Sequence, residues 1–483
     1  MKQSNIESVE AFVDGQAVKS KRKLLQPARN GLVLSAISIA LLSIGASHFS
    51  AMAQTANKNK NANKPGAPAA KEAAVVQVVK PPIAYAYIDA ATSTSDMPGM
   101  NMMGAAMQGS QSGGGLFGAL KGMAKGATTP NDRGNIFGST HNMGFGMGKF
   151  LDISVHTSKN PGLSEAKQLL PSAMLLGDSL QLNAPIPEKA APTPPVVVDE
   201  SPQEPSYEKP KGKISIYWGC GETVRPGQPR TLDVATASIE DYAKFFVMRG
   251  KTTKGARSQL GHPAWPNKID DRKVPENASL VGTHSFVGNG IPESFKLDLA
   301  AAQDLMPAIE LVQTKKDGGV SLEWKSLSQA RGYFIAVMGG MSGRERGGDN
   351  DSGEMVVWTS SELPDFGFGL MDYQSNKDID NWINEKVILP ASATKCEVPK
   401  GIFGEQGTGM LRMIAYGSES YFAYPPRPTD PKIAWEPDWQ LKLRNKATFT
   451  SMLGGMGDMG PKQKPKEEKK NKATELLKNL FGN

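Results

Sequence analysis

The chain has 483 residues and a formal net charge of +7, with 39% hydrophobic residues, 51 glycines and 34 prolines. This length is sufficient for two or three domains, and the many glycines and prolines are typical of short strands and turns that alternate with linkers, which favours an all-β protein. Much of the positive charge lies in lysine-rich segments near the two ends, so the middle of the chain is close to neutral. This distribution argues against a nucleic-acid-binding surface, which needs a focused basic patch.

Residues 1–53 have the pattern of a signal peptide. A basic cluster at 19–23 precedes an apolar run at 31–44, which is shorter than the roughly 20 residues that cross a bilayer. Small residues at Ala51 and Ala53 place the predicted cleavage before Gln54. Cleavage would remove six basic and three acidic groups and reduce the net charge from +7 to +4. We therefore expect a periplasmic or secreted protein; an uncleaved signal anchor is the alternative.

The next part of the chain combines low-complexity segments with short candidate strands. Residues 54–80 are predicted to be a disordered linker because they contain almost no large apolar side chains. An N-terminal β-rich domain is expected at 81–255. It carries a Met/Gly-rich insertion at 93–148 and a Pro-rich insertion at 184–213, followed by a strand at 214–218.

A second domain is expected at 276–428, where the strand signals are clearest. Apolar and polar residues alternate through 320–325, which predicts a strand with one buried face. Further strands are expected at 333–337 and 355–358. Leu322 and Trp324 flank Glu323, and the strands expected at 333–337 and 355–358 follow them. By this pattern, residues about 305–425 resemble a fibronectin type III domain, and the resemblance implies a β-sandwich. The chain is thus expected to contain two β-sandwich-like domains.

The C-terminal part of this domain contains a helix signal and a hairpin signal. Helical spacing of apolar residues near Trp382, behind Asn376 and Asp378 as candidate caps, predicts one helix. Residues 411–424 are interpreted as a closing hairpin that turns at Gly417 and Ser418. Residues 429–483 are predicted to be a tail with a Lys-rich linker and a short amphipathic terminal helix.

Two cysteines, Cys220 and Cys396, are present. In an exported chain they can form a disulfide, which is the pairing we predict. The alternative is a pair of buried free thiols. A catalytic cysteine is not favoured, since no nearby histidine or basic cluster would lower the pKa of either thiol.

A group of methionines in the Met/Gly-rich insertion is a candidate Cu(I) site, since thioethers are soft ligands. Its members are Met97, Met100, Met102 and Met103. The alternative is a flexible linker without ligand.

Two segments are amphipathic and basic, at 115–123 and near the C-terminus. The terminal one places four apolar side chains on one helix face: Leu476, Leu477, Leu480 and Phe481. Such a helix can contact a membrane surface peripherally or dock on a partner. An ordinary terminal helix on a tether is the alternative.

Signatures of enzymes are mostly missing. The chain has no G-x-S-x-G, no H-E-x-x-H and no P-loop motif. The loop at 347–354 offers carboxylates to Ca²⁺ but lacks the EF-hand spacing, so a solvated turn is the other interpretation. His262 with Asp270 and Asp271 could line a small pocket.

We therefore expect an exported, non-enzymatic binding or scaffolding protein with no bound cofactor and a protein or cell-envelope partner. An exported hydrolase with a site between its domains is the first alternative. A Met-rich copper-handling protein is the second.

Overall fold

The computed structural model describes residues 76–96, 135–141, 146–186, 212–341, 354–403 and 409–454. These residues all belong to one compact unit. Among them, no helix is long and apolar enough to span a membrane. The predicted signal peptide, the candidate Cu(I) methionines and the terminal helix lie outside the described residues.

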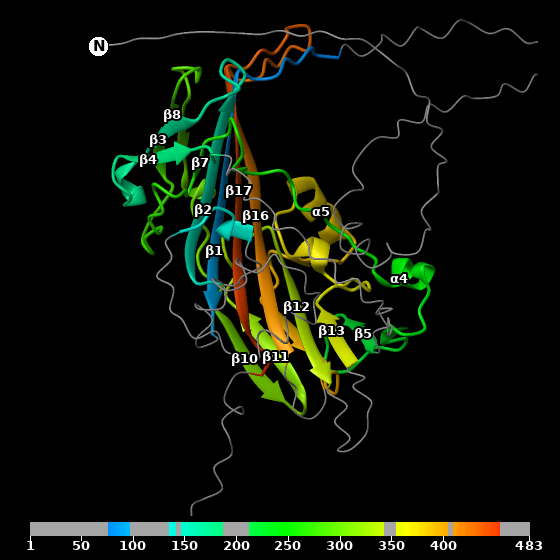
Figure 1. Cartoon of the computed structure of the whole chain (residues 1–483). Coiled ribbons are helices and arrows are strands. Elements are labelled where there is room, and N and C mark those ends of the chain that lie inside the picture. The colour runs from blue at the N-terminus through cyan, green and yellow to red at the C-terminus, as the bar shows by residue number, and fades with distance from the viewer. Residues whose placement is uncertain are drawn as a thin grey trace, which may run out of the picture. The chain divides into compact units, whose positions relative to one another are not determined.

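Strands make up most of the regular secondary structure of the described residues, which confirms the all-β prediction (Figure 1). The strands in the first half of the chain are β1 (Ala84–Ser95), β2 (Gly148–Thr157), β3 (Glu165–Leu169), β4 (Ser179–Asn183), β5 (Lys213–Trp218), β6 (Arg230–Asp233), β7 (Ala264–Trp265), β8 (Gly282–Val287) and β9 (Lys296–Leu299). The later strands are β10 (Leu311–Lys316), β11 (Gly319–Trp324), β12 (Gly332–Met341), β13 (Glu354–Thr359), β14 (Leu389–Pro390), β15 (Lys395–Val398), β16 (Gly409–Tyr424) and β17 (Trp439–Met452). The helices are α4 (Ile239–Phe245) and α5 (Asn376–Asn384), with short 3₁₀ turns η1 (Ser139–His141), η2 (Ser172–Met174), η3 (Ala301–Gln303) and η4 (Phe368–Leu370).

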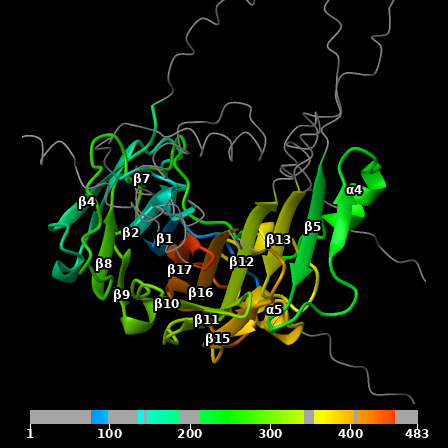
Figure 2. The ribbon, with the colours of Figure 1, turned by 90° about the horizontal axis from the view of Figure 1, so that it is seen from below.

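One large sheet contains most of the strands, in the order β6-β5-β13-β12-β16-β17-β1-β2-β7-β4-β3-β8-β9, with β14 beside β12. Its centre is formed by the two longest strands, β16 and β17, and by β1, which pairs with β17 in parallel. A second sheet has the order β10-β11-β15. Seen end-on, the half of the large sheet from β1 to β9 curls round, while the other half carries α4 and α5 (Figure 2).

Two of the four hydrophobic cores of the described residues share strand β17. The first lies inside the curled half and includes Leu441 and Leu443 from the start of β17. The second lies between the large and the small sheet and includes Ala447 and Phe449 from the end of the same strand. Each core belongs to a β-sandwich-like half of the molecule, and β17 connects the two because its side chains contribute to both.

The sheet does not follow the domain ranges expected from the sequence. β5, from the first range, pairs in parallel with β13 from the second, and β3 pairs with β8. The expectation of a tail from residue 429 is wrong for residues 439–452, which form β17. The domain ranges differ because strands that are neighbours in a sheet need not be neighbours in sequence. The tail was expected because the charged residues of β17 resemble a solvated segment, although they are buried.

The hairpin expected at 411–424 is also wrong, since these residues belong to the single strand β16. Gly417 and Ser418 lie where the register with β17 shifts, between Tyr416 and Glu419. A local irregularity of this kind bends a strand without reversing it.

Helix α5 confirms the helix expected near Trp382. Its N-cap is Ser375, one residue before Asn376, which is the first of the two candidate caps. The Ser375 hydroxyl accepts a hydrogen bond from the Asp378 backbone N–H at 3.0 Å. Because a serine at this position satisfies a backbone donor of the first turn, it fixes where the helix begins.

Strand β11 confirms the alternation at 320–325. Leu322 and Trp324 are buried, and the Trp324 ring lies edge-on to Tyr333 with ring centroids 5.5 Å apart. The Tyr333 hydroxyl accepts a hydrogen bond from the Leu327 backbone N–H at 2.9 Å. This arrangement is not specific to fibronectin type III domains, and the resemblance stays a prediction.

Candidate functional site

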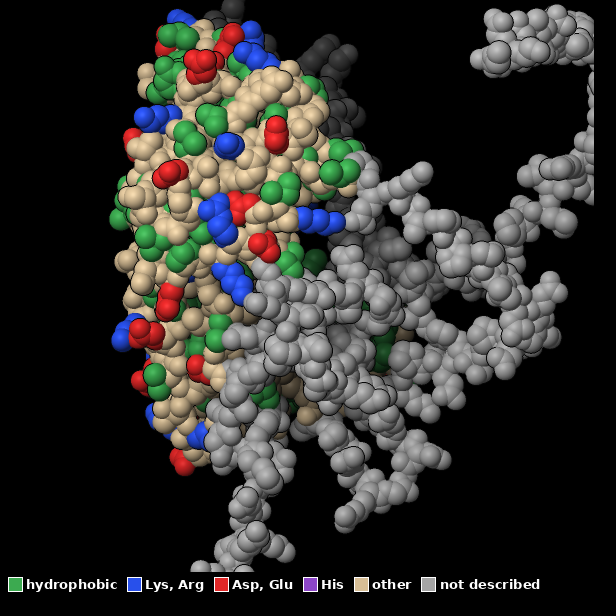
Figure 3. Space-filling model, turned by 60° about the vertical axis from the view of Figure 1, so that its left-hand side comes forward, with side chains coloured by type: hydrophobic (Ala, Val, Ile, Leu, Met, Phe, Trp, Pro, Cys, Tyr) green, Lys and Arg blue, Asp and Glu red, His purple; other side chains and the backbone are tan. Residues whose placement is uncertain are grey.

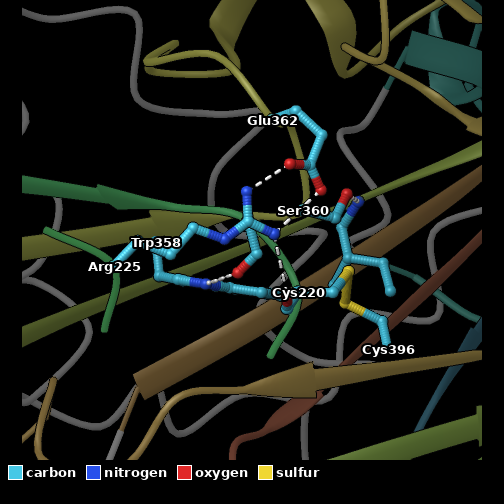
Figure 4. The surroundings of a disulfide bond; sticks show 8 residues. Cys220, Arg225, Trp358, Ser360, Glu362 and Cys396 are labelled. Atoms are coloured by element: carbon cyan, nitrogen blue, oxygen red, sulfur yellow. Dashed lines mark hydrogen bonds and ion pairs between the residues drawn. A yellow bond between two sulfur atoms is a disulfide. The ribbon is translucent and has the colours of Figure 1, made fainter. Parts of the chain in front are cut away.

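Cys220 and Cys396 form a disulfide, as predicted, with their Cα atoms 5.2 Å apart. Cys220 follows β5 of the large sheet and Cys396 lies on β15 of the small sheet, so the bond joins the two layers of the second core (Figure 4). Arg225 donates a hydrogen bond to the Cys220 carbonyl at 3.0 Å and pairs with Glu362. The Glu362 carboxylate raises the pKa of Arg225. The disulfide therefore has a structural role, because it links the large sheet to the small sheet.

Of two other candidate sites, the Ca²⁺ loop is described in part and the site at His262, Asp270 and Asp271 completely. Residues 347–353 of the candidate Ca²⁺ loop lie outside the described residues, and Glu354 accepts a hydrogen bond from Ser215 at 2.5 Å. Asp270 pairs with Arg272, whereas His262 stacks on His156 with ring centroids 4.7 Å apart. In the described part of the chain, no group of three or more His, Cys, Asp or Glu residues has a metal-binding arrangement.

A buried charge network lies on one face of β17. Alternate residues of this strand, Lys442, Arg444 and Lys446, have side chains that are at most 8% exposed. Their partners are Glu419 at 2.7 Å, Asp89 at 2.5 Å and Asp372 at 2.6 Å, respectively. The network therefore connects β17 to β16, to β1 and to the segment after η4.

The electrostatics of this network favour ionised pairs. Burial raises the pKa of Asp89, but the charge of Arg444 outweighs it and leaves that pKa below its ordinary value. Burial acts in the same direction on Asp372, where Lys446 and His141 lower the pKa far below its ordinary value. Buried charges are tolerated when they are paired in this way.

Asp152 of β2 and Asp372 of the charge network together fix residues 135–141. The Asp152 carboxylate accepts hydrogen bonds from the backbone N–H groups of Gly138 at 2.8 Å and Thr140 at 3.1 Å. His141 Nδ1 lies 2.7 Å from an Asp372 carboxylate oxygen. Part of the range expected to be a Met/Gly-rich excursion is therefore attached to the sheet.

We expect the stability of the protein to fall in alkaline solution through His141. Burial lowers the pKa of this histidine, but hydrogen bonds to Asp372 and Asp89 outweigh it and raise the pKa from 6.5 to about 9. Protonated His141 therefore contributes its full stabilisation of the folded state below pH 6.5. This stabilisation is lost as the pH rises through about 9 and the folded-state histidine gives up its proton. Since the side chain is 35% exposed, solvent screening reduces the expected loss to about 1 to 2 kcal/mol.

Urea unfolding at pH 6 and at pH 10, on the wild type and on His141→Gln, measures this loss. The variant should be the less stable of the two at pH 6 and should approach the wild type at pH 10. An equal pH dependence in both proteins would show that another group is responsible.

A groove of about 710 Å³ lies where the curled half of the large sheet fails to close. On one side it is lined by the start of β9, which is the last strand of the sheet. On the other side are residues 421–424 of β16, the neighbouring part of β17 and Tyr85 of β1. β16 pairs with β12 only through residues 409–416, so its second half is an edge as well. We call this space the seam groove.

The lining of the seam groove is aromatic. Tyr421 and Tyr424 are 63% and 48% exposed, and Trp435 is partly exposed. Trp439 forms the base, where it stacks on Phe295 with ring centroids 4.6 Å apart. Exposed aromatic side chains gathered in a concave site are typical of ligand-binding surfaces.

The charges at the seam groove are positive. Lys296 and Arg427 line it, and no Asp or Glu is among its lining residues. Arg427 lies over the Trp435 ring, 5.5 Å from its centroid. Neither Lys296 nor Arg427 forms an ion pair within the described residues. By contrast, positive and negative side chains are interspersed on the flank of the molecule that carries β3, β4 and β8 (Figure 3).

The loop at 427–435, which borders the groove, is held by hydrogen bonds with residues 77–80. Trp435 donates its backbone N–H to the Val78 carbonyl at 2.8 Å, and Lys80 donates to the Trp435 carbonyl at 2.9 Å. The Gln77 side chain donates to the Ile433 carbonyl and accepts from Arg427 at 2.6 Å. These contacts fix the backbone of Trp435 and the guanidinium of Arg427 at the border of the groove.

Comparison with known proteins gives no assignment, since no family model and no curated protein matches the chain. Sequence reasoning also missed the seam groove. The one available signal was the concentration of Tyr, Phe and Trp at 421–439, which was interpreted as part of a hairpin and a tail.

Proposed function

We propose that the chain is an exported binding protein that holds its ligand in the seam groove. The observation that carries the proposal is the exposed aromatic lining of a groove that has only positive charges. The signal-like segment at 1–53 and the disulfide support export, because disulfides persist in oxidising compartments. The ligand then belongs to the periplasm or the cell surface.

The buried network supports binding more than catalysis as the function of the chain. His141 and Asp372 are in contact, as in many acid–base pairs. Asp372 is also paired with Lys446, however, and its depressed pKa prevents it from exchanging protons near neutral pH. The groups that have the geometry of a catalytic pair are therefore engaged in holding strands and segments together.

The proposal predicts that truncating one exposed ring weakens binding. The probes are a synthetic octapeptide of alternating valine and glutamate, and trigalacturonate, each titrated against residues 54–483 while tryptophan fluorescence is followed. Tyr421→Ala should weaken binding of the active probe at least tenfold, which is about 1.4 kcal/mol.

Val312→Ala is the matched control, because Val312 is also 63% exposed and lies outside the groove. It should bind as the wild type does. If neither probe binds the wild type, or if both variants behave alike, the groove is not the binding site.

A further inference from the structure

The seam groove lies between two strand edges that have no partner among the described residues. Within that part of the chain, β9 pairs with β8 alone. In the described part of the chain, residues 420–424 of β16 pair with β17 alone. Each edge therefore presents backbone N–H and C=O groups that are not used by the sheet.

Both edges are short, and their ends are protected. Pro425 and Pro426 end the edge of β16, and Lys296 begins the edge of β9. Proline, lysine and short length are features that prevent two sheets from joining at random. What remains is a short template that admits one extended segment, provided that this segment also fits the side chains around it.

Those side chains suit an extended peptide. The side chains of a strand alternate between faces, so Tyr421 lies on one face of the β16 edge, beside Lys442, while Phe422 and Tyr424 lie on the other face, beside Leu441 and Trp439. An added strand would place one set of its alternate side chains beside Tyr421 and the other set beside Phe422 and Tyr424. Peptide recognition by strand addition combines backbone hydrogen bonds for affinity with side-chain pockets for specificity.

The charge of the groove selects among peptides. Lys296 and Arg427 are exposed and have no carboxylate partner in the described residues, and no lining residue is acidic. A second copy of the same groove would bring like charges together, whereas an acidic peptide would neutralise them.

We propose that the seam groove binds an acidic, extended peptide of a partner protein, which adds to β16 as a new strand. This inference rests on the proposed function and specifies its ligand. Strand addition requires the ligand backbone, which distinguishes it from recognition of an acidic glycan by the same rings and cations.

The test measures binding and amide hydrogen exchange on residues 54–483 with four probes. These are the valine–glutamate octapeptide, its valine–lysine counterpart, the valine–glutamate octapeptide methylated at alternate backbone nitrogens, and trigalacturonate. The valine–glutamate octapeptide should bind and slow amide exchange at residues 420–424. The lysine and the N-methylated peptides should bind at least tenfold more weakly.

Four outcomes would overturn strand addition. If the N-methylated peptide binds as well as its parent, or if binding leaves exchange at 420–424 unchanged, the backbone edge is not used. If trigalacturonate alone binds and Tyr421→Ala weakens it, the groove is a glycan site, and the proposed function stands without strand addition. If no probe binds, the proposed function falls as well.

Discussion

Replacing Arg444 with methionine should lower the free energy of unfolding by about 3 to 5 kcal/mol, the range measured when one partner of a buried ion pair is removed. Asp89 is fully buried and receives two hydrogen bonds from the guanidinium of Arg444, one of them 2.7 Å long. Without Arg444 this carboxylate must either remain charged in the interior or take up a proton. Urea unfolding at pH 7 measures the loss.

Lys80→Met is the matched control, because Lys80 forms an ion pair with Glu436 in which the two side chains are 58% and 56% exposed. Such a pair contributes at most about 1 kcal/mol. The double variant Asp89→Asn/Arg444→Met should recover part of the lost stability, since it leaves no unpaired charge. Equal losses in Arg444→Met and Lys80→Met would contradict a buried network.

Removing the disulfide should have the second largest effect. Cys220 and Cys396 are separated by 176 residues in sequence, and a cross-link over a loop of this length restricts the unfolded chain strongly. The expected loss in Cys220→Ala/Cys396→Ala is about 2 to 5 kcal/mol. Both residues are changed together, so that no free thiol complicates the comparison.

Urea unfolding of the double variant and of the wild type, each without reductant, provides the measurement. Adding reductant should destabilise the wild type and leave the double variant unchanged. A double variant as stable as the oxidised wild type would show that the link between β5 and β15 is dispensable.

The sequence was informative where apolar and polar residues alternate openly. Val320, Leu322 and Trp324 predicted β11 correctly because the polar residues that alternate with them include the exposed Glu323 and Lys325, although Ser321 is buried. In β17 the same alternation is present, with Leu441 and Leu443 on one face, but lysines and an arginine occupy the other face. A pattern of this kind indicates a solvated segment unless the buried partners of the cations are known.

Those partners could not be found from the sequence. Asp89, Asp372 and Glu419 are distant from one another along the chain and meet β17 only in the folded sheet. The seam groove has the same origin, since it brings Tyr85 and Lys296 close to residues 421–441. Neither site has a spacing motif, because each depends on which strands are neighbours.

The domain ranges illustrate the same point. Four hydrophobic cores are present in the described residues, and residues from the beginning, the middle and the end of the chain contribute to the first of them. The Pro-rich range at 184–213 separates β4 from β5 in sequence, and these strands lie in different halves of the sheet. The sequence predicts an insertion within one domain at this range, because composition does not show which strands pair over long distances.

Amide hydrogen exchange on the free protein tests the central claim, which is that the large sheet is open between β9 and β16. Residues 411–415 of β16 are paired on both sides, with β12 and with β17, so their amides should all exchange slowly. At residues 420–424 and in β9, alternate amides point away from the only neighbouring strand and should exchange rapidly. Uniformly slow exchange at residues 420–424 would contradict an open seam.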